Sequence, residues 1–142
     1  NDMSQHEVTL LLGSNLGNPK KNVEEALCRI KKEIGTVIKE SEMLFTDPVE
    51  FVSNNIFCNI AVIIKTQFSP IKLLSLIKII EFDMGRREDS MVTGSYNDRI
   101  IDIDIVKYDN VNFECKKLNI PHYKHVYDRE LSRKLLEGIN KH

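Results

Sequence analysis

Apolar and polar positions along the chain follow the periods of strands and helices in turn. An apolar run within 8–15 ends at a glycine and predicts a buried strand. Residues 36–49 predict a strand that runs into a turn, and the β-branched segment 55–66 predicts another strand. Alternating isoleucines between 99 and 109 predict a further strand, in which polar residues fill the other positions.

Two segments carry the spacing of amphipathic helices, with apolar residues recurring every three or four positions. The first begins after Asn18, which can cap a helix, has proline at its first position and ends at Gly35. The second repeats this pattern from Ser69 to Gly85. The apolar stripes are Val23, Ala26, Leu27, Ile30 and Ile34 in the first helix, and Leu73, Leu74, Ile77, Ile80 and Met84 in the second.

The order of these elements is β-α-β-β-α-β, the split βαβ arrangement of a ferredoxin-like α+β sandwich. An antiparallel sheet with helices on one face would leave the opposite face free for a ligand. A hairpin through Asp109 and Asn110 and a helix over 128–140 would follow as a C-terminal appendage. Residues 1–7 are polar and predict a frayed tail, which leaves 8–142 as a single domain.

Composition excludes several classes of function. The formal net charge is −1, without the basic excess of a protein that binds a nucleic-acid backbone. No apolar run approaches the roughly 20 residues of a membrane-spanning helix. The three cysteines form no C-x-x-C pair and the four histidines no H-x-x-x-H pair, so we expect a cytoplasmic protein with reduced thiols and no zinc site.

Asp102 and Asp104 alternate with isoleucines, so a strand would place both carboxylates on one face. They would lie roughly 7 Å apart and repel each other unless a cation were bound between them. Mg²⁺ is a hard cation that takes one or two carboxylates together with substrate phosphates. A strand whose solvent-exposed face is merely acidic is the alternative for so short a motif.

Segment 55–66 has different chemistry on its two faces. The alternate residues on one face are apolar and are expected to face the helices; they are Ile56, Cys58, Ile60, Val62 and Ile64. The other parity brings Phe57 and Asn59 together on the open face, beside Ala61. A ring can stack on a heterocycle while an amide pairs with its donor and acceptor edge. Two unrelated surface residues are the alternative.

Cationic residues flank the two aspartates. Arg86 and Arg87 precede a polar loop, Arg99 stands just ahead of the strand, and His122 lies beyond the predicted hairpin. A guanidinium group suits phosphate oxygens, whereas a solvated surface charge is the alternative for each arginine, above all for Arg87. We expect loop 86–98 to be mobile without ligand and to close over the site as a lid.

Several stretches resemble, in the right order, one family of enzymes. They are LLGSNLGNP, FTDPV, the pair Phe57 and Asn59, SPIKLLSLIKIIEFDMGR, DRIIDIDI and LNIPH. From about residue 8 to residue 122 the chain resembles 6-hydroxymethyl-7,8-dihydropterin pyrophosphokinase, and ordered motifs are far more specific than any single one. The resemblance implies transfer of pyrophosphate from ATP to the hydroxymethyl group of the pterin, with release of AMP, in folate biosynthesis.

The resemblance also implies roles for individual residues. Asp102 and Asp104 would bind two Mg²⁺ ions, and Arg86 and Arg99 would contact the phosphates of the co-substrate ATP, so that these residues carry catalysis. Further nucleotide contacts would come from Lys78, Glu81, Lys117, Asn119, His122 and Arg129. The pterin pocket would be formed by Thr46, Asp47, Pro48, Val49, Phe57, Asn59 and Tyr96.

The chain departs from the family pattern in two places. The loop from Gly85 to Tyr96 is longer, and it ends in YNDR where the family has W-G-P-R. Asp128 stands where the family has an arginine, Arg129 follows it, and Glu130 stands where a second stacking aromatic is usual. A non-catalytic relative that binds a pterin or a nucleotide is therefore the alternative function. An RNA-binding ferredoxin-like module is disfavoured by the net charge, and we expect a monomer that binds neither nucleic acid nor membrane.

Overall fold

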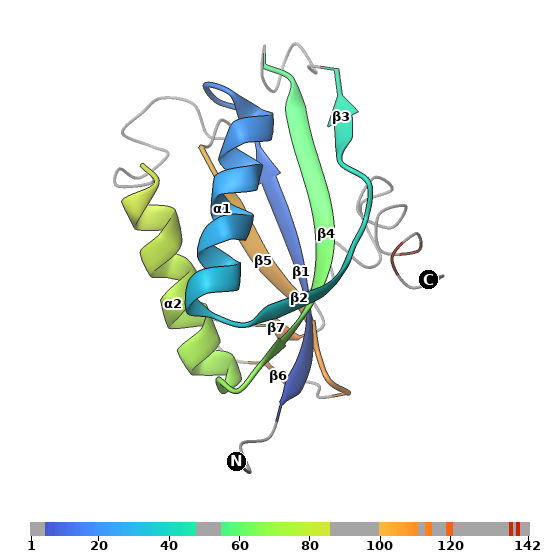
Figure 1. The fold of residues 1–142 in the computed structure, drawn as a ribbon, viewed down its shortest axis with the longest axis vertical. Helices are drawn as coiled ribbons and strands as arrows, with labels where there is room; N and C mark the ends of the chain where they lie inside the picture. The colour runs from blue at the N-terminus through green and yellow to red at the C-terminus, as the bar shows by residue number, and fades with distance from the viewer. Residues whose placement is uncertain are drawn as a thin grey trace.

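The computed structural model describes residues 5–47, 55–85, 100–110, 113–114, 119–120, 137 and 139. Within these residues the strands are β1 (His6–Ser14), β2 (Thr36–Glu40), β3 (Leu44–Thr46), β4 (Phe57–Thr66), β5 (Asp102–Tyr108), β6 (Phe113–Glu114) and β7 (Asn119–Ile120). The helices are α1 (Pro19–Glu33) and α2 (Pro70–Asp83), and Figure 1 shows the arrangement of these elements.

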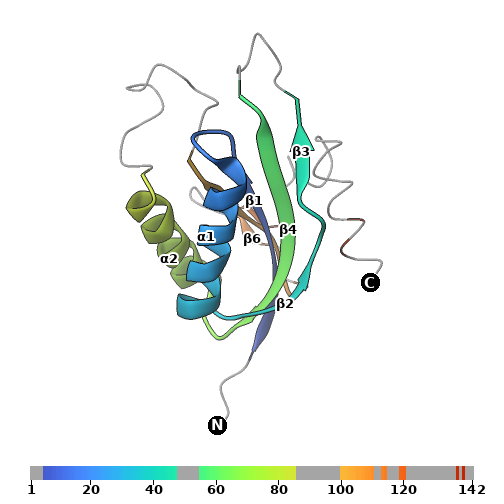
Figure 2. The ribbon, with the colours of Figure 1, turned by 45° about the horizontal axis from the view of Figure 1, so that its top comes forward.

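The main sheet is antiparallel and has the strand order β2-β4-β1-β5, with β3 paired to one end of β4. Both helices lie side by side on one face of this sheet (Figures 1 and 2). This is the antiparallel α+β arrangement that the sequence predicts. The chain turns at Asp109 and Asn110 as expected, but the described ladder beyond that turn joins β6 to β7, whereas β5 pairs with β1.

The strand expected to run from residue 36 into a turn at Asp47 is two strands in the structure, β2 and β3, with residues 41–43 between them. The Ser41 amide donates to the carbonyl of Ala61 at 2.8 Å, and the Ser41 hydroxyl accepts from the Ala61 amide at 2.9 Å. A side-chain oxygen thus replaces the backbone carbonyl that would continue the ladder. The ladder of β2 ends there, and a new one begins at Leu44.

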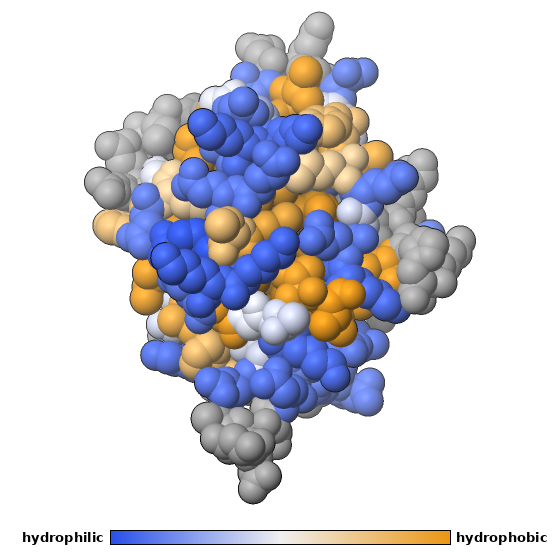
Figure 3. Space-filling model, in the orientation of Figure 1, coloured by the Kyte–Doolittle hydropathy of each residue, from blue (hydrophilic) through white to orange (hydrophobic). Residues whose placement is uncertain are grey.

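Both helices begin where the sequence predicts. The Asn18 side chain accepts a hydrogen bond from the Lys21 amide at 3.2 Å, and the Ser69 hydroxyl accepts one from the Lys72 amide at 3.3 Å. These bonds satisfy amides that have no partner within the first helical turn. In Figure 3 the outward surface of α1 is largely hydrophilic, as expected for a helix with one apolar stripe. Neither α1 nor α2, the helices of the described residues, is long and apolar enough to cross a membrane.

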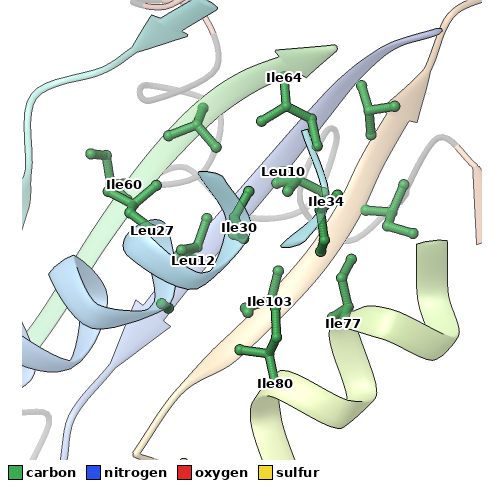
Figure 4. Packing of buried hydrophobic residues seen from close by; sticks show 14 of the residues in the cluster. Leu10, Leu12, Leu27, Ile30, Ile34, Ile60, Ile64, Ile77, Ile80 and Ile103 are labelled. Atoms are coloured by element: carbon green, nitrogen blue, oxygen red, sulfur yellow. The ribbon is translucent and has the colours of Figure 1, made fainter. Parts of the chain in front are cut away.

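The main core fills the space between the sheet and the helices (Figure 4). Its largest side chains are leucine and isoleucine with exposed fractions of 0–2%, among them Leu10, Leu12, Ile30, Ile60, Ile64, Ile77, Ile80 and Ile103. Full burial of each contributes about 1.5–3 kcal/mol, so this layer is the main source of stability. The expectation that Ile56 joins it is wrong, because β4 begins only at Phe57 and Ile56 is 51% exposed.

A second, smaller apolar cluster lies on the opposite face of the sheet. It consists of Leu11, Ala61, Ile63 and Val106 from the strands, together with Ile139 from the C-terminal part of the chain. The prediction of a wholly free face is therefore wrong, because these strands carry apolar residues of both parities and each face needs a cover. Among the described residues this cluster does not reach the end of the face near Gly13, where Asn59 and Asp102 lie.

A bulge in β5 keeps its side chains on the correct faces. Leu10 pairs with Ile105 and Thr9 pairs with Lys107, so Val106 is an extra residue. The parity shifts by one at this point, and Tyr108 therefore faces the helices, where its hydroxyl donates to the Phe68 carbonyl at 2.6 Å.

Asp109 ties the turn after β5 to the beginning of β1. Its carboxylate accepts hydrogen bonds from the Glu7 amide at 2.7 Å and from His6 Nδ1 at 2.8 Å. These bonds extend β1 back to His6, so the last two residues of the expected frayed tail belong to a strand. Desolvation acts to raise the pKa of Asp109, but the bonds from His6 and Glu7 outweigh it and hold that pKa below its usual value.

We expect Asp109→Asn to remove an acid-sensitive part of the stability. A carboxyl with a depressed folded-state pKa stabilises the fold above its unfolded pKa of about 3.9, and the contribution disappears as pH falls through the folded-state value. Asparagine tolerates the φ of 48° at this position and still offers an acceptor to Glu7, but it does not titrate.

The difference in free energy of unfolding between wild type and Asp109→Asn should therefore be largest near neutral pH and shrink below about pH 4. Urea unfolding over a pH series measures it. Glu25→Gln, which removes an exposed carboxylate on α1, serves as the control for a general change of charge. A difference that stays constant with pH would contradict the role given to Asp109.

Candidate functional site

Asp102 and Asp104 lie at the beginning of β5, and their side chains are half-buried on the face opposite the helices. The alternating residues Ile101, Ile103 and Ile105 are buried in the main core. The prediction that the two carboxylates share one face of a strand is therefore confirmed. Because the core fixes the orientation of the isoleucines, it also fixes the orientation of the carboxylates.

The strand register brings the carboxylates into line with the polar residues of β4. Gly13 in β1 pairs with Asn59 on one side and with Asp102 on the other. Since neighbouring strands are about 4.8 Å apart, the backbones of Asn59 and Asp102 are separated by roughly 10 Å across the sheet. Asn59 and Asp102 thus stand on one face with a glycine between them.

Phe57 and Asn59 are both half-buried on this face, as the parity of the strand predicts. Thr46 at the end of β3 pairs with Phe57, and Asp47 follows it as an exposed residue. The described part of the expected heterocycle pocket therefore comes from adjacent ends of β3 and β4. An aromatic ring and an amide at neighbouring positions can stack on a ring and bind its polar edge.

Glu81 is 2% exposed, and its carboxylate is bonded to β5. Oε2 accepts a hydrogen bond from the Ile103 amide at 2.7 Å, and Oε1 lies 3.3 Å from Nζ of Lys78. The Ile103 amide belongs to the peptide that joins Asp102 to Ile103. The resemblance implies a nucleotide contact for Glu81, which stays a prediction, and its carboxylate also holds the strand that carries the two aspartates.

Lys78 is largely exposed and lines a pocket on the outer side of α2. The pocket has a volume of about 530 Å³, and its other lining residues are Ile71, Leu74, Ser75, Ile79 and Phe82. Among the described lining residues Lys78 is the cation and most of the others are apolar, which suits a ligand with a flat apolar part and a negative charge. The Glu81 carboxylate joins α2 to β5, the strand that carries the two aspartates.

The loop after β1 is fixed at the same end of the sheet by Asn22, a residue that the sequence analysis did not single out. Its amide nitrogen donates to Ser14 Oγ at 3.1 Å and to the Leu16 carbonyl at 2.7 Å. Ser14 is fully buried, so the bond also satisfies a polar group that would otherwise be costly to bury. An asparagine within the first turn of a helix carries no periodic signal that would have pointed to this role.

The remaining predicted site residues lie outside the described residues or are described in part. Those outside are Pro48, Val49, Arg86, Tyr96, Arg99, Lys117, His122 and Arg129, and the expected lid at 86–98 lies there too. Asn119 is the first residue of β7, which lies beside β5.

The donor set suits magnesium better than a transition metal. In the described part of the chain no cluster of three or more histidine, cysteine, aspartate or glutamate side chains could hold a metal ion. Two carboxylates on one face offer hard oxygen donors, and Mg²⁺ accepts such a pair together with phosphate oxygens. The described residues therefore fit a cation that binds jointly with a phosphorylated substrate.

The sequence matches the family model described as 7,8-dihydro-6-hydroxymethylpterin-pyrophosphokinase over residues 9–140. A curated relative from Bacillus subtilis, 2-amino-4-hydroxy-6-hydroxymethyldihydropteridine pyrophosphokinase, is 33% identical over 121 residues, which cover 84% of this chain and 70% of the relative. The mitochondrial folate synthesis bifunctional protein of Arabidopsis thaliana is 39% identical over 119 residues. That match covers 84% of this chain but 21% of the relative, so this chain spans about a fifth of the plant protein.

A similar fold occurs in the solved structure of Plasmodium falciparum HPPK-DHPS with pteroate. The TM-score is 0.72 at 17% sequence identity, and the match covers 98% of this chain and 39% of the other. At this identity the match bears on the fold alone.

We expect Glu81→Ala to destabilise the protein by about 1–3 kcal/mol, because it leaves the buried Ile103 amide without its acceptor. Glu81→Gln keeps an acceptor oxygen and should cost less. Chemical denaturation measures both, and Glu25→Ala, an exposed glutamate on α1, is the matched control. If Glu81→Ala were no less stable than Glu25→Ala, the bond to β5 would have no importance for the fold.

Proposed function

Since the chain belongs to the 7,8-dihydro-6-hydroxymethylpterin-pyrophosphokinase family, we propose that it transfers a pyrophosphoryl group from ATP to 6-hydroxymethyl-7,8-dihydropterin. The products would be AMP and the pterin diphosphate, in a step of folate biosynthesis. The observation that carries this proposal is the row of Asn59, Gly13 and Asp102 across one face of the sheet. An amide suited to a heterocycle and a carboxylate suited to a metal stand in line there.

We expect Asp102 and Asp104 to hold two Mg²⁺ ions together with phosphate oxygens of ATP. When bound, the ions would neutralise charge on the phosphates and lower the pKa of the pterin hydroxyl group. The part of the protein is mainly positioning, because phosphoryl transfer needs the reacting oxygens in line and little covalent chemistry from side chains. The burial of Ile103 and its bond to Glu81 support this view, since both restrict the backbone that carries the carboxylates.

The reaction would join the hydroxymethyl oxygen of the pterin to the β-phosphorus of ATP. The bond between that phosphorus and the oxygen bridging to the α-phosphorus would break, and AMP would leave with the electron pair. The proton of the hydroxyl group would pass to solvent, so no side-chain base is assigned.

The pterin would occupy the face formed by the ends of β3 and β4. Phe57 would stack on the ring, Asn59 would bond to its polar edge, and Thr46 to Val49 would form the adjoining wall. The half-burial of Phe57 and Asn59 supports this assignment, because each can contact a ligand and still be held by its neighbours.

The nucleotide would extend from the aspartates past β5 toward α2. Lys78 supports this direction, since its ammonium group lies 3.3 Å from the Glu81 carboxylate, which is bonded to β5. Further contacts are proposed from the resemblance for Arg86, Arg99, Lys117, Asn119, His122 and Arg129, and a lid contact for Tyr96. Glu81 would act through β5, as the holder of the strand that binds the metal.

Several finer predictions accompany this proposal. A C-terminal hairpin and helix would complete the domain over 8–142, and the protein would work as a cytoplasmic monomer. A non-catalytic relative that binds the pterin or the nucleotide is the alternative, and Glu130 at the expected aromatic position favours it. Release of AMP from ATP in the presence of the dihydropterin and Mg²⁺ distinguishes the two.

Asp102→Asn and Asp104→Asn should each lower the rate of AMP release by about 100-fold or more, because each removes a metal ligand while leaving the core intact. Rates at saturating Mg²⁺ and the thermal midpoint of each variant measure the two effects separately. Glu25→Gln, on the exposed side of α1, is the charge-matched control. A variant with the wild-type rate and wild-type dependence on Mg²⁺ would refute the metal assignment.

Phe57→Ala should weaken binding of the pterin about fivefold, because the lost ring stack is worth on the order of 1 kcal/mol. The affinity for an ATP analogue should stay nearly unchanged. Phe45→Ala is the matched control, since Phe45 lies in the neighbouring strand β3 and is 52% exposed. Equal pterin affinities of the two variants would show that the pocket has been assigned to the wrong residue.

A further inference from the structure

Gly13 is buried in β1, at the centre of the row that joins Asn59 to Asp102. Its backbone is not in the left-handed region that favours glycine, unlike that of Gly17 and Gly85, whose φ angles are 63° and 117°. Any residue could therefore adopt the conformation of Gly13. Glycine within a strand is also less stable than alanine by roughly 0.5–1 kcal/mol, so stability does not explain its presence.

The space around Gly13 gives a reason for glycine. A Cβ at this position would lie 2.6 Å from Oδ1 of Asn59, which is closer than real contacts allow. The next atoms, Cγ of Asn59 at 3.6 Å and the carbonyl oxygen of Cys58 at 3.8 Å, are at ordinary contact distances. The single conflict is with the amide oxygen, so the end of the Asn59 side chain uses the volume that a side chain at Gly13 would need.

The amide of Asn59 therefore leans over β1 toward the strand that carries Asp102. Its oxygen faces Gly13, and its nitrogen lies farther from that point than the atoms just named. The side chain ends in a flexible group, so an added methyl at Gly13 would turn the amide aside and leave the backbone in place. We therefore expect an added methyl group at Gly13 to leave the fold intact and to change the direction of the Asn59 amide.

We infer that Gly13 is a positioning residue that sets the direction of the Asn59 amide and thereby selects the heterocycle that the site binds. The inference rests on the proposed function for the identity of the ligand, a bicyclic ring with adjacent hydrogen-bond donors and acceptors. A larger residue at 13 would displace the amide, and the ring would lose its edge contact while the metal and nucleotide contacts remained.

The direct test is Gly13→Ala, with affinities measured by titration of 6-hydroxymethylpterin in the presence of Mg²⁺ and a non-hydrolysable ATP analogue. The expected result is at least about a fivefold loss of pterin affinity. The affinity for the ATP analogue should change less than about twofold, and the thermal midpoint should be equal or higher. Wild-type pterin affinity in the variant would overturn the inference.

A double-mutant cycle separates positioning from a general structural effect. In Asn59→Ala the amide is absent, so adding Gly13→Ala should change pterin affinity no further. If Gly13→Ala weakened pterin binding by the same factor in both backgrounds, the effect would not pass through Asn59 and the inference would be wrong.

The environment of the Asn59 amide can also be measured without a ligand, so the inference can be tested separately from the proposed function. The side-chain amide resonances of Asn59 in a ¹⁵N-labelled protein should shift in Gly13→Ala, together with few backbone signals beyond β1 and β4. Unchanged Asn59 resonances would overturn the inference even if the protein releases AMP. Shifted resonances in a protein without pterin binding or AMP release would instead refute the proposed function and leave the packing of Gly13 against Asn59 established.

Discussion

The register of β1 with both of its neighbours is the constraint on which the rest of this structure depends. Side chains alternate between the two faces of a strand, so a slip of one residue would turn Asp102 and Asp104 into the main core and expose Ile103. Burial of isoleucines and leucines on the helix face prevents that slip. Near the other end of β5, the bulge at Val106 shifts the alternation of side chains by one residue, so that Tyr108 also faces the helices. The Asp109 carboxylate accepts a hydrogen bond from the Glu7 amide and so holds the beginning of β1. The geometry of the candidate site is thus a consequence of packing on the opposite face.

Within the described residues the sheet is apolar on both faces over part of its length, and the candidate site residues lie on the remainder. Leu11, Ala61, Ile63 and Val106 require a cover, which in the described residues includes Ile139. Toward Gly13 the same strands carry Asn59 and Asp102 in place of apolar residues. One sheet therefore serves as a core element at one end and carries the candidate site residues at the other, and the change of residue type along each strand marks the border.

The helices and most strands could be predicted from the sequence because their signals are local. Caps at Asn18 and Ser69 and the apolar periods need no knowledge of distant contacts. The break at Ser41 could not be predicted, because it depends on a hydroxyl group replacing a carbonyl in a ladder with a distant strand. The shared face of Asp102 and Asp104 follows from parity alone. The burial of Glu81 does not, because its spacing from Lys78 is also typical of an exposed ion pair.

Within the described residues β5 is the last strand on one side of the main sheet, and this position has a consequence for self-association. An edge strand presents amides and carbonyls that another chain can extend into a continuous sheet, and such edges promote aggregation. The Glu81 carboxylate accepts a hydrogen bond from the Ile103 amide, so this amide already has its partner. The same contact brings a negative charge and the end of α2 against this side of β5. A second molecule could not pair there in register without displacing a buried charge. The same bond that holds the aspartate-bearing strand therefore also discourages the protein from polymerising through it.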